Sequence, residues 1–270
     1  MTDPLIREVL PADIPALSSL WRRVFGDSEA LISDFFTRLP QMGVGVTALA
    51  DGKPVGAAYA VTGLELIDGP AAPAACGYLY AVAVEEAYRG LGLGRALSLA
   101  AAEKARERGA DLICTLPAEA SLYPWYQDIL GVTTALFRRE EQIKSRAFVS
   151  CRRIDAEAYL LQRERMLYGR PHLRLSLPCL QFQHCLCLEY GGGFYAAGGG
   201  IAAAYREGDT GIIRELLCPE GEKLELAASV GAALKAERVL LYTPAEKGRP
   251  YIAADPGSIP AGCIWNLSFD

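Results

Sequence analysis

Three glycines alternate with other residues in the stretch YAVAVEEAYRGLGLGRALSLAAAEKA, between a strand-like segment and a helix-like one. Glycine reaches backbone conformations that side chains forbid, and it lets a ligand approach the main chain. The free N–H groups and the dipole at the start of a helix attract anions. The stretch therefore predicts that a diphosphate binds at Gly90, Gly92 and Gly94.

Two common nucleotide-binding turns do not fit this spacing. The dinucleotide fingerprint GxGxxG would need a further glycine where the chain has Arg95. A Walker A loop would need Lys and then Ser or Thr after its last glycine, but Gly94 is followed by Arg95 and Ala96. Neither loop is predicted here.

The segment RGLGLG instead resembles motif A of the GCN5-related N-acetyltransferases (GNAT). Their pattern Arg/Gln-x-x-Gly-x-Gly/Ala is matched by Arg89, Gly92 and Gly94. The order of predicted elements over roughly the first 140 residues is similar to that of the family.

The resemblance implies acetyl-CoA as co-substrate, with its pyrophosphate on the backbone amides of the glycine-rich turn. Backbone groups of the preceding strand would bond the pantetheine and the thioester carbonyl. The implied cofactor-binding residues are Val82, Ala83, Val84, Arg89, Gly90, Leu91, Gly92, Gly94 and Arg95.

The same resemblance implies a tyrosine that protonates the departing thiolate of coenzyme A while a primary amine attacks the thioester directly. The stretch SLYPWYQDILGV is similar to the family pattern L-x-x-F-Y-x-x-x-G-F, with Tyr126 as the match and Trp125 before it. Gly131 lies one residue further on than usual, so Tyr123 stays an alternative. A packing role for both tyrosines is also open.

The general base is not assigned by the sequence. The carboxylates of Glu85, Glu86, Glu119 and Asp270 are candidates, and a bound water is another. The amine acceptor is not identified either, and it is predicted to be a small molecule or a peptide.

The pattern of apolar residues indicates the order β, α, α, β, β, β, α, β, α, β in the first half, ending with the strand TTALFRREEQI. This order predicts an α/β (α+β) fold with a mixed, mostly antiparallel sheet of the GNAT type, flanked by helices. In the second half, AERVLLYTPAE resembles the earlier GADLICTLPAE, and each follows a helix. The turn CPEGEK before the second helix has a single glycine.

We therefore predict a GNAT acetyltransferase domain at residues 1–148 and a degenerate GNAT-like domain at residues 149–270. The arrangement resembles the tandem acetyltransferases of the enhanced intracellular survival type. Chance similarity of two strand–helix–strand units is the alternative.

The bulk composition narrows the class of protein. Of 270 residues, 51% are hydrophobic and the formal net charge is −5, which disfavours a nucleic-acid binder. We see no apolar run of about 18 residues and no signal peptide, so neither a membrane span nor secretion is expected, and the predicted location is cytoplasmic. The oligomeric state stays open.

The eight cysteines contain no CxxC pair, and two histidines are present. The cluster HCLC alternates with leucines, so we predict a strand from about Leu180 to Tyr190 with buried thiols, no metal site and no disulfides. The predicted function is an acetyl-CoA-dependent N-acetyltransferase. The alternative is a non-catalytic acyl-CoA-binding or regulatory module on the same fold.

Overall fold

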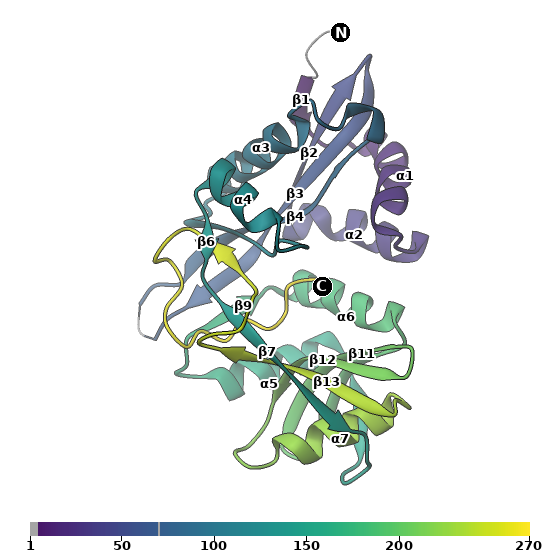
Figure 1. The fold of residues 1–270 in the computed structure, drawn as a ribbon, viewed down its shortest axis with the longest axis vertical. Helices are drawn as coiled ribbons and strands as arrows, with labels where there is room; N and C mark the ends of the chain where they lie inside the picture. The colour runs from purple at the N-terminus through teal and green to yellow at the C-terminus, as the bar shows by residue number, and fades with distance from the viewer. Residues whose placement is uncertain (1–4, 70) are drawn as a thin grey trace. The chain divides into compact units, whose positions relative to one another are not determined.

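The computed structural model describes residues 5–69 and 71–270, which divide into two compact units (Figure 1). The first unit comprises residues 5–66, 72–135 and 250–259, and the second is formed mainly by residues 136–249 and 260–270. Each unit is a sheet of mostly antiparallel strands flanked by helices. The predicted α/β fold class is therefore confirmed.

In the first unit the strands follow the order β1-β2-β3-β4-β5-β15-β6. Neighbouring strands are antiparallel except β4 and β5, which are parallel and are joined by the crossover helix α3. The elements are β1 (Leu5–Glu8), α1 (Ile14–Phe25), α2 (Glu29–Met42), β2 (Gly43–Ala50), β3 (Lys53–Ile67), β4 (Ala74–Val84), α3 (Leu93–Glu107), β5 (Leu112–Thr115), α4 (Leu122–Leu130), β6 (Thr133–Thr134) and β15 (Ala253–Ala254).

Strand β3 shows how both faces of this sheet are covered. The ring of Tyr59 lies 5.5 Å from Trp21 of α1 and 5.0 Å from Phe35 of α2, measured between centroids. Its neighbours Ala58 and Ala60 are buried in another cluster, with residues of α3 and α4. Successive side chains of a strand point to opposite faces, so α1 and α2 cover an aromatic face and α3 approaches a face of small residues.

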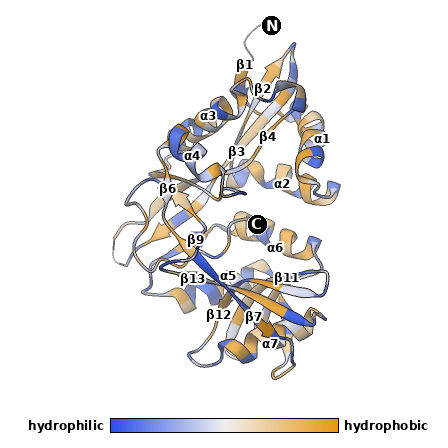
Figure 2. Cartoon of the chain, in the orientation of Figure 1, coloured by the Kyte–Doolittle hydropathy of each residue, from blue (hydrophilic) through white to orange (hydrophobic). Residues whose placement is uncertain are grey.

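In the second unit the sheet has the order β14-β7-β13-β12-β11-β10-β8. Strands β12 and β13 are parallel and are joined by α7. Strand β7 is rich in charged residues, which Figure 2 colours blue. The elements are β7 (Phe137–Lys144), β8 (Cys151–Ile154), α5 (Ala156–Leu167), β9 (His172–Leu175), α6 (Leu177–Glu189), β10 (Gly193–Ala197), β11 (Gly200–Glu207), β12 (Thr210–Leu217), α7 (Lys223–Ala233), β13 (Arg238–Ala245) and β14 (Arg249–Pro250).

Helix α6 contradicts the strand predicted from Leu180 to Tyr190, and that prediction is wrong. The alternation of Leu186 and Leu188 suggested a strand, but Leu188 is exposed. The buried positions instead recur at intervals of three and four residues, which is helical spacing. They are Cys179, Leu180, Phe182, Gln183, Leu186 and Cys187.

The stretch predicted as the last strand of the first half is divided between the two units. Its first residues form β6 in the first sheet, and its remainder forms β7 beside β13 in the second sheet. Strand β15, from near the end of the chain, lies between β5 and β6. The compact units change at residues 135 and 136, and the domain division at residues 148 and 149 stays a prediction.

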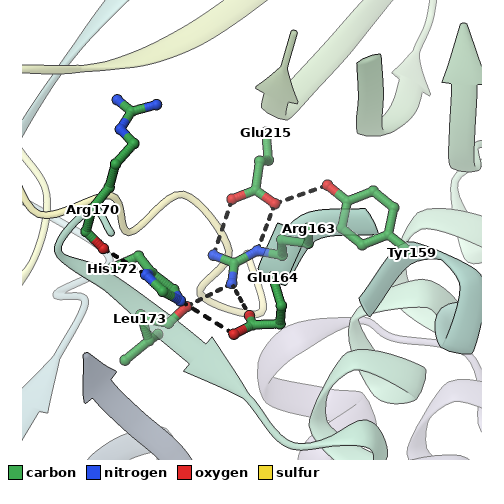
Figure 3. A network of polar contacts seen from close by, with 7 residues as sticks. All are labelled: Tyr159, Arg163, Glu164, Arg170, His172, Leu173 and Glu215. Atoms are coloured by element: carbon green, nitrogen blue, oxygen red, sulfur yellow. Dashed lines mark hydrogen bonds and ion pairs between the residues drawn. The ribbon is translucent and has the colours of Figure 1, made fainter. Parts of the chain in front are cut away.

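A buried ion pair joins α5 to β12 (Figure 3). The side chains of Arg163 and Glu215 are 1% and 0% exposed, and Arg163 Nε lies 2.9 Å from Glu215 Oε1. The Tyr159 hydroxyl donates to the same carboxylate at 2.8 Å, and Arg163 Nη1 donates to the Leu173 carbonyl at 2.7 Å. A buried charge is tolerated when it is paired and hydrogen-bonded, so these contacts act as one group.

Removing one member of this pair should strongly destabilise the second unit. We expect Glu215→Ala to lower the free energy of unfolding by about 3–5 kcal/mol, because Arg163 would lose its buried counter-charge and keep only the longer ion pair with the partly exposed Glu164. Urea unfolding followed by circular dichroism measures the change. The control is Glu140→Ala, which removes the exposed pair with Arg249 and should cost at most about 1 kcal/mol. Equal losses in the two variants would contradict the assigned role of Glu215.

Candidate functional site

The glycine turn, residues 89–95, connects β4 to α3. Gly90 and Gly92 have φ of +76° and +80°, a left-handed conformation that side chains disfavour. A Cβ atom at either position would meet nothing within 4 Å, so the space above the turn is open. The first intrahelical bond runs from the Ala96 N–H to the Gly92 carbonyl. The amides that precede it, from Leu93 to Arg95, lie in the first turn, whose N–H groups point away from the helix.

Helix α4 packs against the start of α3. A Cβ atom added to Gly94 would lie at ordinary contact distance, 3.7 Å, from Cζ2 of Trp125, so the indole lies close to this turn. Arg95 and Asp128 form an ion pair of 2.7 Å between the two helices. Both side chains are mostly exposed, so packing rather than the ion pair holds α4 there.

The parallel ladder between β4 and β5 is short. It runs from Cys76 opposite Leu112 to Leu79 opposite Thr115, where β5 ends. Strand β4 continues to Val84, and Ala81 has a φ of +49° where the register with β3 shifts. The predicted residues Val82, Ala83 and Val84 therefore lie beyond the end of β5, next to the glycine turn.

Two hydrogen bonds join the end of this ladder to its surroundings. The Thr115 hydroxyl donates to the Leu79 carbonyl at 3.2 Å. Arg89 Nε donates to the Val84 carbonyl at 3.1 Å, which ties the glycine turn to the end of β4. Sequence reasoning did not identify Thr115, because nothing in its local sequence distinguishes it from other strand threonines.

The predicted acid, Tyr126, lies at this same point. Its side chain is 8% exposed, and its hydroxyl lies near the side chain of Thr115. Burial raises the pKa of the Tyr126 hydroxyl above its ordinary value, and the nearby Thr115 side chain opposes this in part. The ring packs edge-to-face on Trp125, with centroids 4.8 Å apart. The structure thus holds a protonated hydroxyl where β4 and β5 separate.

The alternative tyrosine has a different partner. The Tyr123 hydroxyl donates to the backbone carbonyl of Tyr251 at 2.9 Å, on the segment that leads into β15. Tyr251 is buried, so this bond helps attach that segment to α4. Tyr123 therefore contacts the segment before β15, whereas Tyr126 lies near the end of the β4–β5 ladder.

The candidate bases differ in their pairing. Glu85 forms an ion pair with Arg23, and Glu119 accepts a hydrogen bond from Ser121 at 3.4 Å. Glu86 is exposed at the start of the short helical turn that follows β4. Asp270 belongs to the second unit, where its Oδ2 lies 3.2 Å from Arg138 and 3.1 Å from Arg214. These contacts do not single out one base.

The described residues can also be searched for membrane-spanning helices and for metal-binding side chains. Across 5–69 and 71–270, the structure has no helix that is long and apolar enough to span a membrane. Within those residues, no group of three or more His, Cys, Asp or Glu side chains is arranged to hold a metal ion.

Comparison with known proteins addresses the fold and the family. Residues 13–132 match the model of the acetyltransferase (GNAT) family. No curated protein matches the chain. Among solved structures, a probable N-acyltransferase from Enterococcus faecalis has a TM-score of 0.70 and 14% identity, over 94% of this chain and 72% of that one.

Two further solved structures are similar over nearly the whole chain. A GCN5-related N-acetyltransferase from Kribbella flavida has a TM-score of 0.67 and 15% identity, covering 93% of this chain and 71% of that one. Eis1 from Mycobacterium abscessus has a TM-score of 0.63 and 13% identity, covering 92% and 73%. At these identities the likeness concerns the fold.

The first unit therefore carries an acyltransferase fold with a glycine turn at the end of its bulged strand. Residues 13–132 belong to the acetyltransferase (GNAT) family, as the motif predicted. Membership of that family supports acyl-CoA-dependent N-acetyl transfer as the general class of reaction.

The glycine turn can be tested through its backbone conformation. We expect Gly92→Val to weaken coenzyme A binding by about tenfold or more, because a β-branched residue disfavours a φ of +80° and fills the open space. Isothermal titration calorimetry measures the dissociation constant. The matched control is Gly26→Val, at a φ of +79° after α1, which should bind coenzyme A normally. Equal affinity in the two variants would contradict the placement of the phosphates.

Proposed function

We infer that the protein is an acetyl-CoA-dependent N-acetyltransferase whose acceptor is a primary amine. One observation carries this proposal. The buried Tyr126 hydroxyl lies near Thr115, the last β5 residue of the β4–β5 ladder, and the glycine turn follows β4. A proton donor and an anion-binding turn thus share one strand end.

The residues at this strand end suit acetyl-CoA. Open space lies above Gly90 and Gly92, and the first-turn N–H groups can donate hydrogen bonds to the pyrophosphate, with Leu91 and Arg95 beside them. The backbone of Val82, Ala83 and Val84, beyond the end of β5, can bond an extended amide arm. When bound, acetyl-CoA supplies a thioester that an amine can attack.

In this proposal Tyr126 holds the proton that the sulfur atom needs as the C–S bond breaks. Burial keeps its hydroxyl protonated, so it can donate that proton to the sulfur. The attacking amine must lose a proton, and Glu85, Glu86, Glu119, Asp270 or a bound water could accept it. The ion pair of Glu85 with Arg23 makes that carboxylate less available than an unpaired one.

The remaining predictions belong to the same proposal. The acceptor is a small molecule or a peptide, and residues 149–270 are a degenerate copy of the acetyltransferase domain. All eight cysteines are free, which suits a reducing cytoplasm. The alternative is a non-catalytic acyl-CoA-binding module. Release of free thiol from acetyl-CoA with a panel of amines separates the two, since the module would bind coenzyme A without turnover.

Removing the Tyr126 hydroxyl should affect turnover and not cofactor binding. We expect Tyr126→Phe to lower kcat by about a hundredfold or more, with little change in acetyl-CoA affinity, because the proton donor is lost and the ring remains. Thiol release measures kcat, and calorimetry measures affinity. Tyr123→Phe, on the same helix, should keep kcat near that of the wild type. A fall in kcat confined to Tyr123→Phe would reassign the acid.

The pH dependence should follow from the raised pKa of Tyr126. A raised pKa keeps the hydroxyl protonated beyond the ordinary tyrosine value of about 10. We therefore expect kcat to rise with pH as the acceptor amine loses its proton, with no fall below about pH 10. Thiol release measured from pH 6 to 10 checks this. A decline centred near pH 8 would exclude Tyr126 as the group that limits the reaction.

A further inference from the structure

The second unit contains a strand separation of its own. The parallel ladder between β12 and β13 runs from Thr210 opposite Arg238 to Ile213 opposite Leu241 and stops there. Strand β12 continues to Leu217, and β13 continues to Ala245. The backbone edges of residues 214–217 and 242–245 thus lie past the end of the ladder. Backbone N–H and C=O groups at such edges need partners.

A cavity of about 360 Å³ lies at this separation, and we call it the second slot. Its walls come from both strands, from the turn at residues 218–221, from the end of α5 and from Ile264 and Asn266. Most of the lining side chains are apolar, including Met166, Leu216, Leu241 and Pro244. A cavity with apolar walls and few polar groups is typical of a small-molecule site.

One polar atom in the second slot has no partner. The Oγ1 atom of Thr243 is buried, and within the described part of the chain it makes no hydrogen bond. A buried hydroxyl left unsatisfied costs about 1–3 kcal/mol, so such groups call for an explanation. Thr243 lies two residues past Leu241, the last position of β13 that is paired with β12. A ligand in the slot would satisfy this hydroxyl.

The turn at the slot disfavours phosphate. Pro219 has no N–H to donate, and Glu220 and Glu222 place negative charge at the start of α7. Carboxylates there already occupy the favourable end of the helix dipole and repel an anion. The glycine turn of the first unit has arginines at the corresponding place, Arg89 and Arg95.

The lining of the slot is also close to neutral. Lys223 lies at its edge, and its ammonium is 2.5 Å from the carboxylate of Glu141. Arg170 and Glu220 contribute opposite charges. The Arg170 carbonyl lies 2.7 Å from Nδ1 of His172. Figure 3 shows the Arg170 side chain directed away from this network. A neutral ligand suits this balance better than a charged one.

We propose that the second slot binds an uncharged, extended amide with apolar side groups, such as a short blocked peptide. Its amides would pair with the strand edges past the β12–β13 ladder, and its carbonyl would accept from the Thr243 hydroxyl. Its apolar groups would lie against Met166, Leu216 and Leu241. The site is separate from the acetyl-CoA site proposed for the first unit, and it can be tested without acetyl transfer.

Cysteine alkylation provides the test on the full chain. Cys218 lines the slot, and Cys151 is a half-buried thiol outside its lining. Burial raises the pKa of both thiols, so each is compared with its own labelling rate in the absence of the probe. The probe is N-acetyl-leucyl-leucine N-methylamide, and peptide mass spectrometry follows iodoacetamide labelling. We expect the probe to slow labelling of Cys218 by about fivefold or more and to leave Cys151 unchanged, since a bound ligand covers the slot.

Two comparisons make the outcome decisive. Thr243→Val keeps the shape of the side chain but removes the hydroxyl, so it should weaken the protection of Cys218 severalfold. The control is Thr210→Val. The Thr210 hydroxyl bonds Asp209 and does not line the slot, so this variant should keep the protection of Cys218. The carboxylate N-acetyl-leucyl-leucine and acetyl-CoA should protect Cys218 poorly. Unchanged labelling of Cys218 at the solubility limit of the probe, equal protection of Cys151, or full protection in Thr243→Val would overturn the proposal.

Discussion

The early end of the β4–β5 ladder is the constraint on which the first unit depends. Parallel strands cannot be joined by a tight turn, so α3 must cross over the sheet and begin near the end of β4. The glycine turn supplies the sharp change of direction that this start requires. The same early end leaves the last residues of β4 beyond β5 and brings Thr115 next to Tyr126. One feature of strand pairing thus brings together the glycine turn, an extended strand edge and the Tyr126 hydroxyl.

The second unit uses the same backbone arrangement with different chemistry. Strands β12 and β13 are also parallel, are also joined by a helix, and also separate after a short ladder. The turn there carries Pro219 and two glutamates where the first unit carries glycines and arginines. The two separations therefore differ in local electrostatics and not in backbone arrangement.

Several features of the fold follow from local sequence and could be predicted. The glycine turn, the amphipathic helices α1 and α2 and the strands around Asp51-Gly52 depend on neighbouring residues. Helix α6 was mispredicted because it is buried on several sides, so its apolar residues do not form one clear stripe. Strand β15 is two residues long and pairs with residues more than a hundred positions away, and no local pattern marks it.

The sequence by itself determined the turn, the helix start and the family, because these depend on residue types within a few positions of one another. It also offered two tyrosines of one helix as candidate acids. In the folded chain their surroundings differ, since the Tyr123 hydroxyl bonds the Tyr251 carbonyl and the Tyr126 hydroxyl lies near Thr115. The pairing of β7 and β15 is visible only in the tertiary structure. Strand pairing depends on side-chain burial and on backbone hydrogen bonds between segments that are far apart in the sequence.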